Sequence, residues 1–108
     1  QNTSPNIKYI GTWTNDGVCC HWSNTINSSA AVLFYGTGIR YRYTKASDRG
    51  TAKITIDGAF HSDLNQYSNM TLPNQSTTYN LGLGFHQIHV AVKNAGGKID
   101  VDSFEIIP

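Results

Sequence analysis

The sequence predicts an all-β protein that folds as a sandwich of two antiparallel sheets. Apolar and polar residues alternate along short segments, so that Ile39, Tyr41 and Tyr43 share one face of a strand. Turn-forming residues separate these segments at intervals of roughly 8–12 residues, a spacing typical of β-sandwiches. The 108 residues contain no linker, repeat or low-complexity block. We therefore expect a single domain over residues 1–108.

Strands in the first half are separated by glycine-containing turns. Gly36-Thr37-Gly38 is expected to divide two strands, and the loop 47–50 is expected to precede a strand whose inward side chains are Ala52, Ile54 and Ile56. Asp57-Gly58 supplies the positive φ angles of a tight hairpin. The expected strands of this half lie near 7–13, 20–24, 30–36, 38–45, 51–57 and 59–64.

The second half begins with a polar stretch, 63–78, which we interpret as a long surface loop with one short strand at most. Three further strands are expected near 77–82, 86–93 and 99–107. His86 and His89 are three residues apart on a strand, so they face opposite sides and cannot hold one metal ion. On the last strand Asp102 shares its side with Phe104, where a buried carboxylate needs a partner or a metal ion. Alternatively Val101 faces inward and leaves Asp102 exposed.

The composition argues against several classes of function. The net charge is +1 and 14% of the residues are charged, so no strong field attracts nucleic acid. No apolar run approaches the ~20 residues that span a bilayer. Seven acidic residues include a single glutamate, and no nucleophile elbow or metal-binding helix is present. We therefore expect no catalytic residues and no enzymatic activity.

Two features bear on the compartment. The only cysteines are adjacent, Cys19-Cys20, and can form a strained vicinal disulfide, stay free, or bridge to another chain. Four N-glycosylation sequons begin at Asn2, Asn27, Asn69 and Asn74. They favour a secreted, extracellular glycoprotein, although abundant Asn and Thr also produce sequons by chance.

The strand pattern also resembles a known family. The order of an aromatic-x-Gly-Thr-Gly-Ile strand (34–39), an Asp-Arg-Gly loop (48–50) and an Ile-x-Ile-Asp-Gly strand (54–58) is similar to galactose-binding-like jelly-roll modules. Such modules are appended to extracellular carbohydrate-active enzymes. The segments 9–13, 83–90 and 99–106 extend the likeness over most of the chain. The resemblance implies a jelly-roll β-sandwich and a non-catalytic carbohydrate-binding module.

The resemblance also implies a possible calcium ion. Related sugar-binding families carry a calcium-ligating aspartate in the closing strand, which corresponds here to Asp102. Their partner ligands are acidic residues in the first strand. This chain departs from that pattern, because its first acidic residue is Asp16.

Sugar recognition requires an aromatic platform and planar hydrogen-bonding side chains. The candidate ligand-binding residues are Trp22, Tyr43 and Tyr67 for stacking, with Arg42, Lys45, Asp48 and Arg49 for hydrogen bonds. Each has a plainer explanation: Tyr43 can belong to the core, and Asp48-Arg49 can simply close a turn.

The leading hypothesis is weak, reversible binding of a polysaccharide or other glycan. The alternative is a structural or interaction protein on the same fold, such as an adhesin domain, a fibre subunit, or a viral or cell-surface assembly domain. The partners would then be further copies of the chain, whereas a binding module would adjoin an attached enzyme domain.

Overall fold

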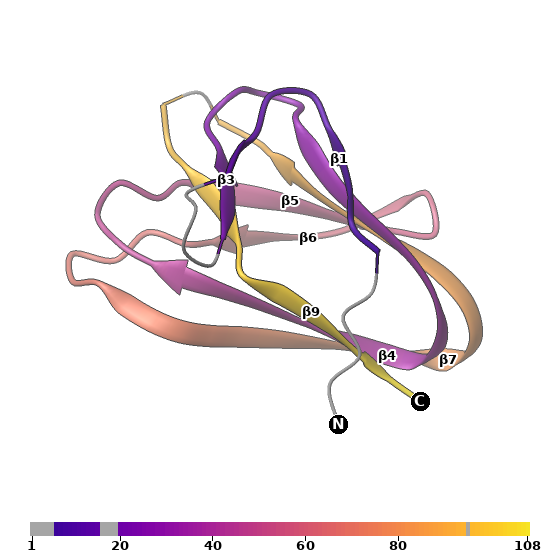
Figure 1. Cartoon of the computed structure of the whole chain (residues 1–108). Helices are drawn as coiled ribbons and strands as arrows, with labels where there is room; N and C mark the ends of the chain where they lie inside the picture. Colours follow the sequence, from indigo (N-terminus) through magenta and orange to yellow (C-terminus); the bar gives the residue numbers. More distant parts are fainter. Residues whose placement is uncertain (1–5, 16–19, 95) are drawn as a thin grey trace.

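Two long strands organise the structure, a computed structural model that describes residues 6–15, 20–94 and 96–108. β4 (Ser29–Lys45) and β7 (Leu72–Val92) pair antiparallel along nearly their whole length, from Ser29 opposite Ala91 to Lys45 opposite Leu72. Both strands bend, as Figure 1 shows at the lower right. The first part of β4 pairs with β1 (Lys8–Ile10) and its second part with β9 (Ser103–Ile107), so β4 contributes to both layers.

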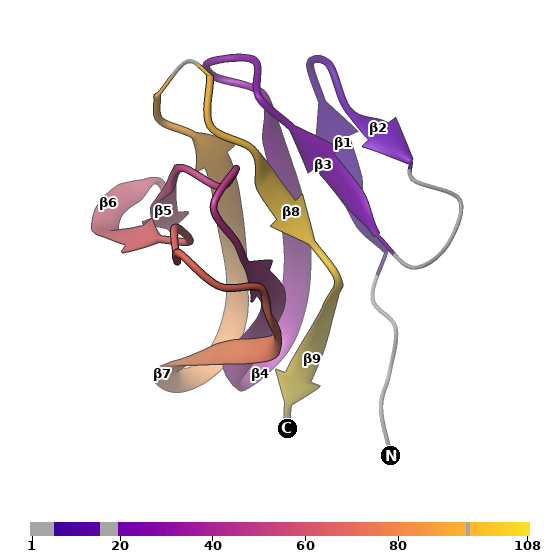
Figure 2. The same ribbon diagram turned by 90° about the vertical axis from the view of Figure 1, so that its left-hand side faces the viewer.

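The remaining strands complete the two antiparallel sheets. β5 (Thr51–Ile56) pairs with the C-terminal part of β7, and β6 (Ala59–Asn65) pairs with β5 at the edge. β2 (Thr14–Asn15), β3 (His21–Ser23) and β8 (Ile99–Val101) form a small sheet in that order of pairing. Figure 2 shows β3 and β8 facing β5 and β7 across the sandwich. The described residues contain no helix, so the predicted all-β jelly-roll sandwich is confirmed.

The core lies between the two layers and is formed by the side chains that alternation assigns to it. Tyr41, Ile39 and Ile54 are fully buried, and Phe104 from β9 stacks on Tyr41 at a ring separation of 5.1 Å. The predicted inward faces of 39–43 and 52–56 are therefore confirmed. Their burial removes apolar surface from water, which stabilises the fold by roughly 25 cal/mol for each Å² of that surface.

Three expected boundaries were wrong. Gly36-Thr37-Gly38 does not separate two strands, because β4 continues through it with a register shift between Gly36 and Gly38. This bulge changes the inward set from even-numbered residues such as Phe34 to odd-numbered residues such as Ile39. The expected loop 63–78 is mostly strand, because β6 extends to Asn65 and β7 starts at Leu72. The last strand is interrupted at Asp102, between β8 and β9.

The Asp57-Gly58 hairpin is confirmed. Asp57 has a φ of 55° and Gly58 a φ of 82°, as the two-residue turn between β5 and β6 requires. The turn also has a second attachment, because Asp57 Oδ1 accepts a hydrogen bond from the backbone N–H of Gln87 on β7 at 2.8 Å.

Candidate functional site

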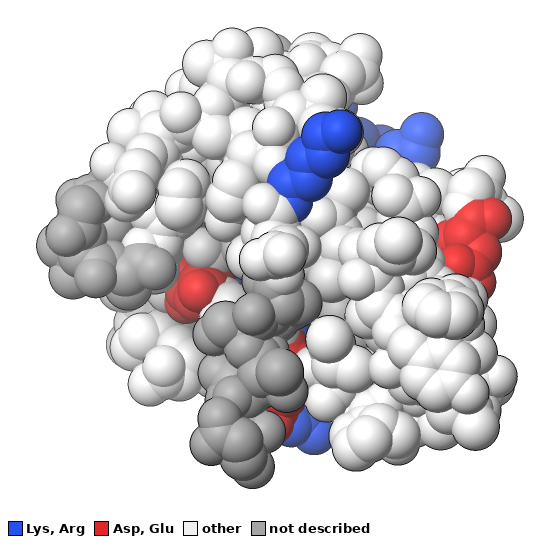
Figure 3. Space-filling view, turned by 45° about the vertical axis from the view of Figure 1, so that its right-hand side comes forward, with Lys and Arg blue, Asp and Glu red and all other residues white. Residues whose placement is uncertain are grey.

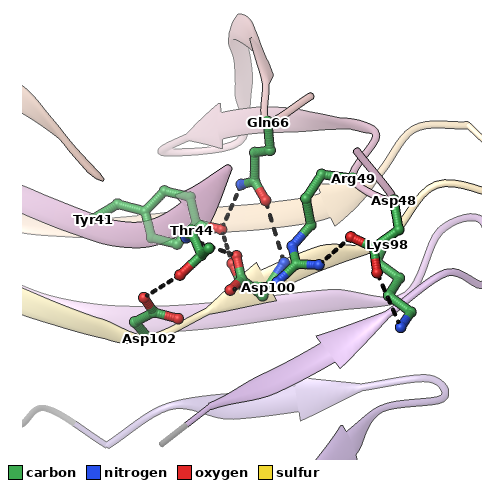
Figure 4. Close-up of polar contacts among 8 residues, drawn as sticks. All are labelled: Tyr41, Thr44, Asp48, Arg49, Gln66, Lys98, Asp100 and Asp102. Carbon is green, nitrogen blue, oxygen red and sulfur yellow. Dashed lines mark hydrogen bonds and ion pairs between the residues drawn. The ribbon is translucent and has the colours of Figure 1, made fainter. Parts of the chain in front are cut away.

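Asp100 lies at the centre of a polar cluster where the loop after β4 meets β8. Ile99 and Val101 on either side are buried in the core, and Asp100 itself is 3% exposed. Its backbone N–H donates to Gln66 Oε1 at 3.2 Å, and its carbonyl oxygen accepts from the Tyr41 hydroxyl. Its side chain accepts from the backbone N–H of Thr44 at 3.1 Å (Figure 4). These contacts fix the carboxylate relative to both layers.

Gln66 and Tyr41 form the buried base of this cluster. Gln66 is fully buried, and its amide nitrogen donates to the Tyr41 hydroxyl at 2.8 Å. Burial raises the pKa of Tyr41 well above its ordinary value, so the phenol stays protonated. Its hydroxyl donates a hydrogen bond to the Asp100 carbonyl oxygen. Both side chains therefore support the cluster and are not available to a ligand.

A chain of charges leads from Asp100 to the surface. Arg49 Nη2 lies 3.5 Å from Asp100 Oδ2, and Arg49 Nη1 pairs with Asp48. Lys98 Nζ lies 3.3 Å from Asp48 Oδ2 and 4.3 Å from the centre of the Trp22 ring. Burial acts to raise the pKa of Asp48, but the cations of Arg49 and Lys98 outweigh it, and the pKa is lowered. We call Trp22, Asp48, Arg49, Lys98 and Asp100 the loop-edge cluster.

Pairing between distant segments assembles the loop-edge cluster. Trp22 on β3 lies opposite Asp100 on β8 in the small antiparallel sheet. The loop after β4 reaches the same edge because Arg49 forms a parallel bridge with Lys98. Gly50 and Gly97 touch at this crossing: a Cβ added to Gly97 would lie 2.6 Å from the Gly50 Cα. Two glycines are therefore required for the loops to approach so closely.

Asp102 lies beside the cluster and differs from Asp100 in its environment. Its Oδ2 accepts from the Thr44 hydroxyl at 3.2 Å, while its Oδ1 is buried without a hydrogen-bond partner. Burial, and then the neighbouring Asp100 carboxylate, raises the pKa of Asp102 to about 7. The predicted sharing of an inward side with Phe104 was wrong. β8 ends before Asp102, so Val101 and Phe104 both face the core, and Asp102 lies half-buried.

The fit of this region to calcium is partial. Cys20, Asp100 and Asp102 form the one group of potential ligands found among the described residues, with their donor atoms within 4.8 Å of one another. The unpartnered Asp102 Oδ1 favours a cation, and Asp102, Asp100 and the Thr44 hydroxyl would hold it. Calcium takes about six to eight oxygen ligands, however. Arg49 already neutralises Asp100, and Cys20 belongs to a disulfide.

Only one of the two cysteines of the predicted vicinal disulfide, Cys20, lies among the described residues. Cys20 is buried and disulfide-bonded. Cys19 lies outside the described residues, so the Cys19-Cys20 bond stays a prediction. Asn2 also lies outside them. The other three sequon asparagines, Asn27, Asn69 and Asn74, are exposed, and their glycosylation stays a prediction.

The structure gathers several predicted ligand-binding residues at the loop edge. Trp22, Asp48 and Arg49 belong to the cluster described above. Lys45 ends β4 just before the loop, and Tyr67 is 52% exposed beside it, next to the Ala46–Tyr67 bridge. These five residues come from β3, from the end of β4, from the loop after β4 and from the segment between β6 and β7.

Two predicted residues lie elsewhere. Tyr43 is 4% exposed, with its hydroxyl 2.9 Å from Thr77 Oγ1, so its ring belongs to the core and cannot stack on a sugar. Arg42 points to the outer surface of the β4–β9 pair, where its Nη2 lies 3.4 Å from Glu105 Oε1. Glu105 also pairs with Arg40 at 2.8 Å, so the two arginines form a separate surface group.

Sequence reasoning missed Asp100 and Lys98. Only Asp102 was singled out on the last strand. Asp100 was missed, although it stands between Ile99 and Val101, two residues typical of a core. Lys98 follows a glycine pair, and only the pairing of β3 with β8 brings it to Trp22. Gln66 has a structural role, because its side chain is completely buried.

Comparison with known proteins identifies the fold. No family model and no curated protein sequence matches the chain. A family 35 carbohydrate-binding module from an environmental isolate is similar, at 14% identity and a TM-score of 0.70, over 94% of this chain and 85% of that one. A family 36 module in complex with calcium and xylotriose matches at 14% identity and a TM-score of 0.61, over 96% of each chain.

Larger enzymes contain a similar unit. A family two carbohydrate esterase from Clostridium thermocellum, in complex with cellohexaose, matches at 16% identity and a TM-score of 0.68. The match covers 94% of this chain but 31% of the esterase, so this chain spans about a third of that enzyme's length. At these identities the likeness establishes the fold: the chain is a β-sandwich of the kind found in carbohydrate-binding modules.

Two general surface properties complete the description. On the face that Figure 3 shows, charged side chains are few and most of the surface is uncharged. Within the described ranges, no helix has the length and apolar character needed to cross a bilayer.

Proposed function

We propose that the chain is a non-catalytic carbohydrate-binding module that binds a glycan weakly and reversibly at the loop edge. The observation that carries this proposal is that Trp22, through Lys98, and exposed Tyr67, through its bridge to Ala46, both adjoin the loop that carries ion-paired Asp48 and Arg49. A pyranose offers an apolar face to aromatic rings and a rim of hydroxyls to planar polar groups. Lys45 adds a flexible donor beside them.

The paired state of the charges supports binding over catalysis. Glycoside hydrolysis uses two carboxyl groups flanking the bond, one of them a proton donor. Among the described carboxylates, Asp57, Asp63 and Glu105 each pair with a basic side chain far along the chain. Asp100 and Asp102 do lie together, but Asp100 is buried beneath Arg49 and is fixed by backbone contacts. Asp48 is held by two cations.

Weak affinity follows from the geometry. Tyr67 and Asp48 are exposed at the edge of the sandwich, and a shallow site there buries little of each sugar ring. Calcium held at Asp102 is part of the proposal, supported by the unpartnered Asp102 Oδ1 and by the family 36 neighbour that was solved with calcium. The ligands of the neighbours, xylotriose and cellohexaose, are the first glycans to try.

The proposal is tested by titrating the chain with cellohexaose and xylotriose in a calorimeter. Tyr67→Ala is expected to weaken binding by about three- to tenfold, because an aromatic contact of ~0.5–1.5 kcal/mol is lost. Trp22→Ala is expected to weaken it at least as much. Phe60→Ala removes an equally exposed ring from β6 and serves as the matched control, with unchanged affinity.

The result that contradicts the proposal is equally specific. If Trp22→Ala and Tyr67→Ala both bind the oligosaccharides as tightly as the unmodified chain, the loop edge is not the site. If no oligosaccharide, and no polysaccharide in an affinity gel, retains the unmodified chain, the proposed function fails as a whole.

A further inference from the structure

A second surface of the molecule has the chemistry of a binding platform. Leu33 and Tyr35 on β4 are 69% and 54% exposed, and Leu83 and Phe85 on β7 are 65% and 75% exposed. Tyr35 and Phe85 are directly opposite in the β4–β7 register, and their ring centres lie 5.0 Å apart in an edge-to-face arrangement. We call these four residues the bend patch. Contiguous exposed apolar patches of this kind mark interaction sites in soluble proteins.

The position of the bend patch separates it from the loop-edge cluster. It lies just before the β4 bulge, where alternation turns Phe34 into the core and its neighbours Leu33 and Tyr35 outward. In Figure 1 the bends of β4 and β7 lie at the right, whereas β4 ends at the left, where the loop 46–50 begins. A ligand on the bend patch therefore does not touch Trp22 or Arg49.

Hydrogen bonds hold the bend patch in a defined shape. His86 Nδ1 lies 2.6 Å from Asp57 Oδ2, and His86 Nε2 lies 2.6 Å from the Gly82 carbonyl oxygen. The backbone N–H of Gln87 donates to Asp57 Oδ1 at 2.8 Å. These bonds fix the β7 segment that carries Leu83 and Phe85 to the Asp57-Gly58 hairpin. The exposed side chain of Gln87, opposite Leu33, borders the patch.

The size and charge of the patch decide between possible occupants. A stable protein–protein interface buries about 800 Å² per partner, and a fully exposed aromatic side chain supplies roughly 150–250 Å². Four partly exposed side chains offer less than such an interface needs, but enough for two or three sugar rings. None of the four is charged, which does not favour a nucleic acid or an anionic surface.

We propose that the bend patch is a second glycan-binding surface, on the outer side of the β4–β7 pair. This inference rests on the proposed function, because it assumes that the ligand of the chain is a glycan. Tyr35 and Phe85 contact the apolar faces of neighbouring sugar rings, Leu33 and Leu83 cover their edges, and the Gln87 amide bonds a hydroxyl. Two such surfaces on one module let it contact two chains of a polysaccharide or two parts of one chain.

The experiment is a titration of the isotopically labelled chain with cellohexaose, followed by amide NMR shifts. Two groups of amides are expected to shift: those of 33–35 and 83–87, and those of 45–49 and 67. Phe85→Ser is expected to reduce the cellohexaose-induced shifts of the first group of amides at least fivefold. The shifts of the second group are expected to stay unchanged. Tyr67→Ala is expected to do the reverse. Because Phe85 is 75% exposed, its replacement leaves the core intact.

The possible results separate this inference from the proposed function. Shifts at the loop edge alone, or bend shifts that Phe85→Ser does not alter, overturn the second surface and leave the first. Shifts at the bend alone overturn the loop-edge site and support the bend patch. The absence of any shift overturns both. A concentration-dependent dimer that Phe85→Ser dissociates, with no effect of cellohexaose at the bend, identifies the patch as a self-association surface and overturns the inference.

Discussion

His86 has a hydrogen-bond acceptor at each ring nitrogen, the Asp57 carboxylate at Nδ1 and the Gly82 carbonyl at Nε2. A neutral imidazole carries one N–H and satisfies only one of these acceptors, whereas the imidazolium donates to both. The hydrogen bond that His86 donates to Asp57, followed by the one it donates to Gly82, accordingly raises the pKa of His86 above 6.5. The same contact lowers the pKa of Asp57 below 3.8. The charge on His86 thus holds the Asp57-Gly58 hairpin against the bend of β7.

The stability contributed by this pair is expected to depend on pH in both directions. Because the pKa of folded His86 is raised, its contribution is complete below 6.5 and is lost as pH rises through the folded value. Because the pKa of Asp57 is lowered, its contribution is present above 3.8 and is lost as pH falls through the folded value. The free energies of unfolding in urea of the unmodified chain and of His86→Gln should therefore differ most between pH 3.8 and pH 6.5.

Subtracting the two unfolding curves isolates the pair from other titrating groups. The difference in unfolding free energy between the unmodified chain and His86→Gln is expected to shrink above pH 7. His61→Gln is the control, since among the described residues His61 hydrogen-bonds its neighbour Ser62 and makes an edge-to-face contact with the Tyr79 ring. A difference that stays constant from pH 5 to pH 9 would show that His86 is not a cation in the folded chain.

Asp102 gives a second prediction for a single residue. Its pKa is raised, whereas the pKa of Asp57 is lowered. Its folded pKa of about 7 exceeds the ordinary 3.8, so the folded chain binds the proton more tightly than the unfolded chain. Stability is therefore expected to fall as pH rises from about 4 to about 7. Asp102→Asn, which cannot ionise, should remove that fall and be the more stable variant at pH 8, as measured by urea unfolding.

The same variant tests calcium. If calcium binds ionised Asp102, adding the ion at pH 8 raises the unfolding midpoint of the unmodified chain and leaves that of Asp102→Asn unchanged. Equal behaviour of the two chains with and without calcium would remove Asp102 from the list of candidate ligands.

At the scale of the element, β4 depends on its bulge. The backbone passes close to β9 there: a Cβ added to Gly36 would lie 2.3 Å from the Ile107 carbonyl oxygen. The Thr37 hydroxyl donates to the Pro108 carbonyl oxygen at 3.1 Å, so the end of the chain is fixed to the same place. The bulge therefore shifts the β4–β7 register by two residues, from Gly36 opposite Gly84 to Gly38 opposite Asn80, and the end of β9 packs against it.

Gly36→Ala is expected to destabilise the chain by about 1–3 kcal/mol, because the methyl group and the β9 backbone cannot occupy the same space. Gly82→Ala is the matched control in the partner strand β7, where an added Cβ meets nothing within 4 Å. It should change the free energy of unfolding by no more than ~1 kcal/mol. Urea unfolding measures both variants, and equal destabilisation would contradict the close approach of β4 to β9.

At the scale of the whole molecule, the bent pair β4–β7 determines where function can be located. Because both strands bend, their bends form one edge of the sandwich, and β4 ends at the opposite edge, where the loop 46–50 begins, as Figure 1 shows. The loop edge joins Trp22 to Lys98 and Arg49 to Asp100, contacts between residues 76 and 51 positions apart in the 108-residue chain. The bend edge carries the exposed apolar side chains.

Much of the fold could be predicted from the sequence, because alternation along a strand is a local property. The inward set Ile39, Tyr41 and Ile54 and the Asp57-Gly58 hairpin depend on residues within one or two strands. The site could be predicted only in part: Trp22, Asp48 and Arg49 were recognised by residue type. Asp100 and Lys98 were not, since their roles depend on partners that only pairing between distant strands supplies.

The amino-acid pattern alone determined the class of fold and the side chains of the core, because burial follows the two-residue period of a strand. Tertiary structure decided that Gly36-Thr37-Gly38 bends one strand instead of ending it, because β9 lies against it and β7 pairs on both sides of the bulge. It also decided which polar residues meet. Asp100 became the centre of the cluster, because only the stacking of two layers determines which polar side chains lose contact with water.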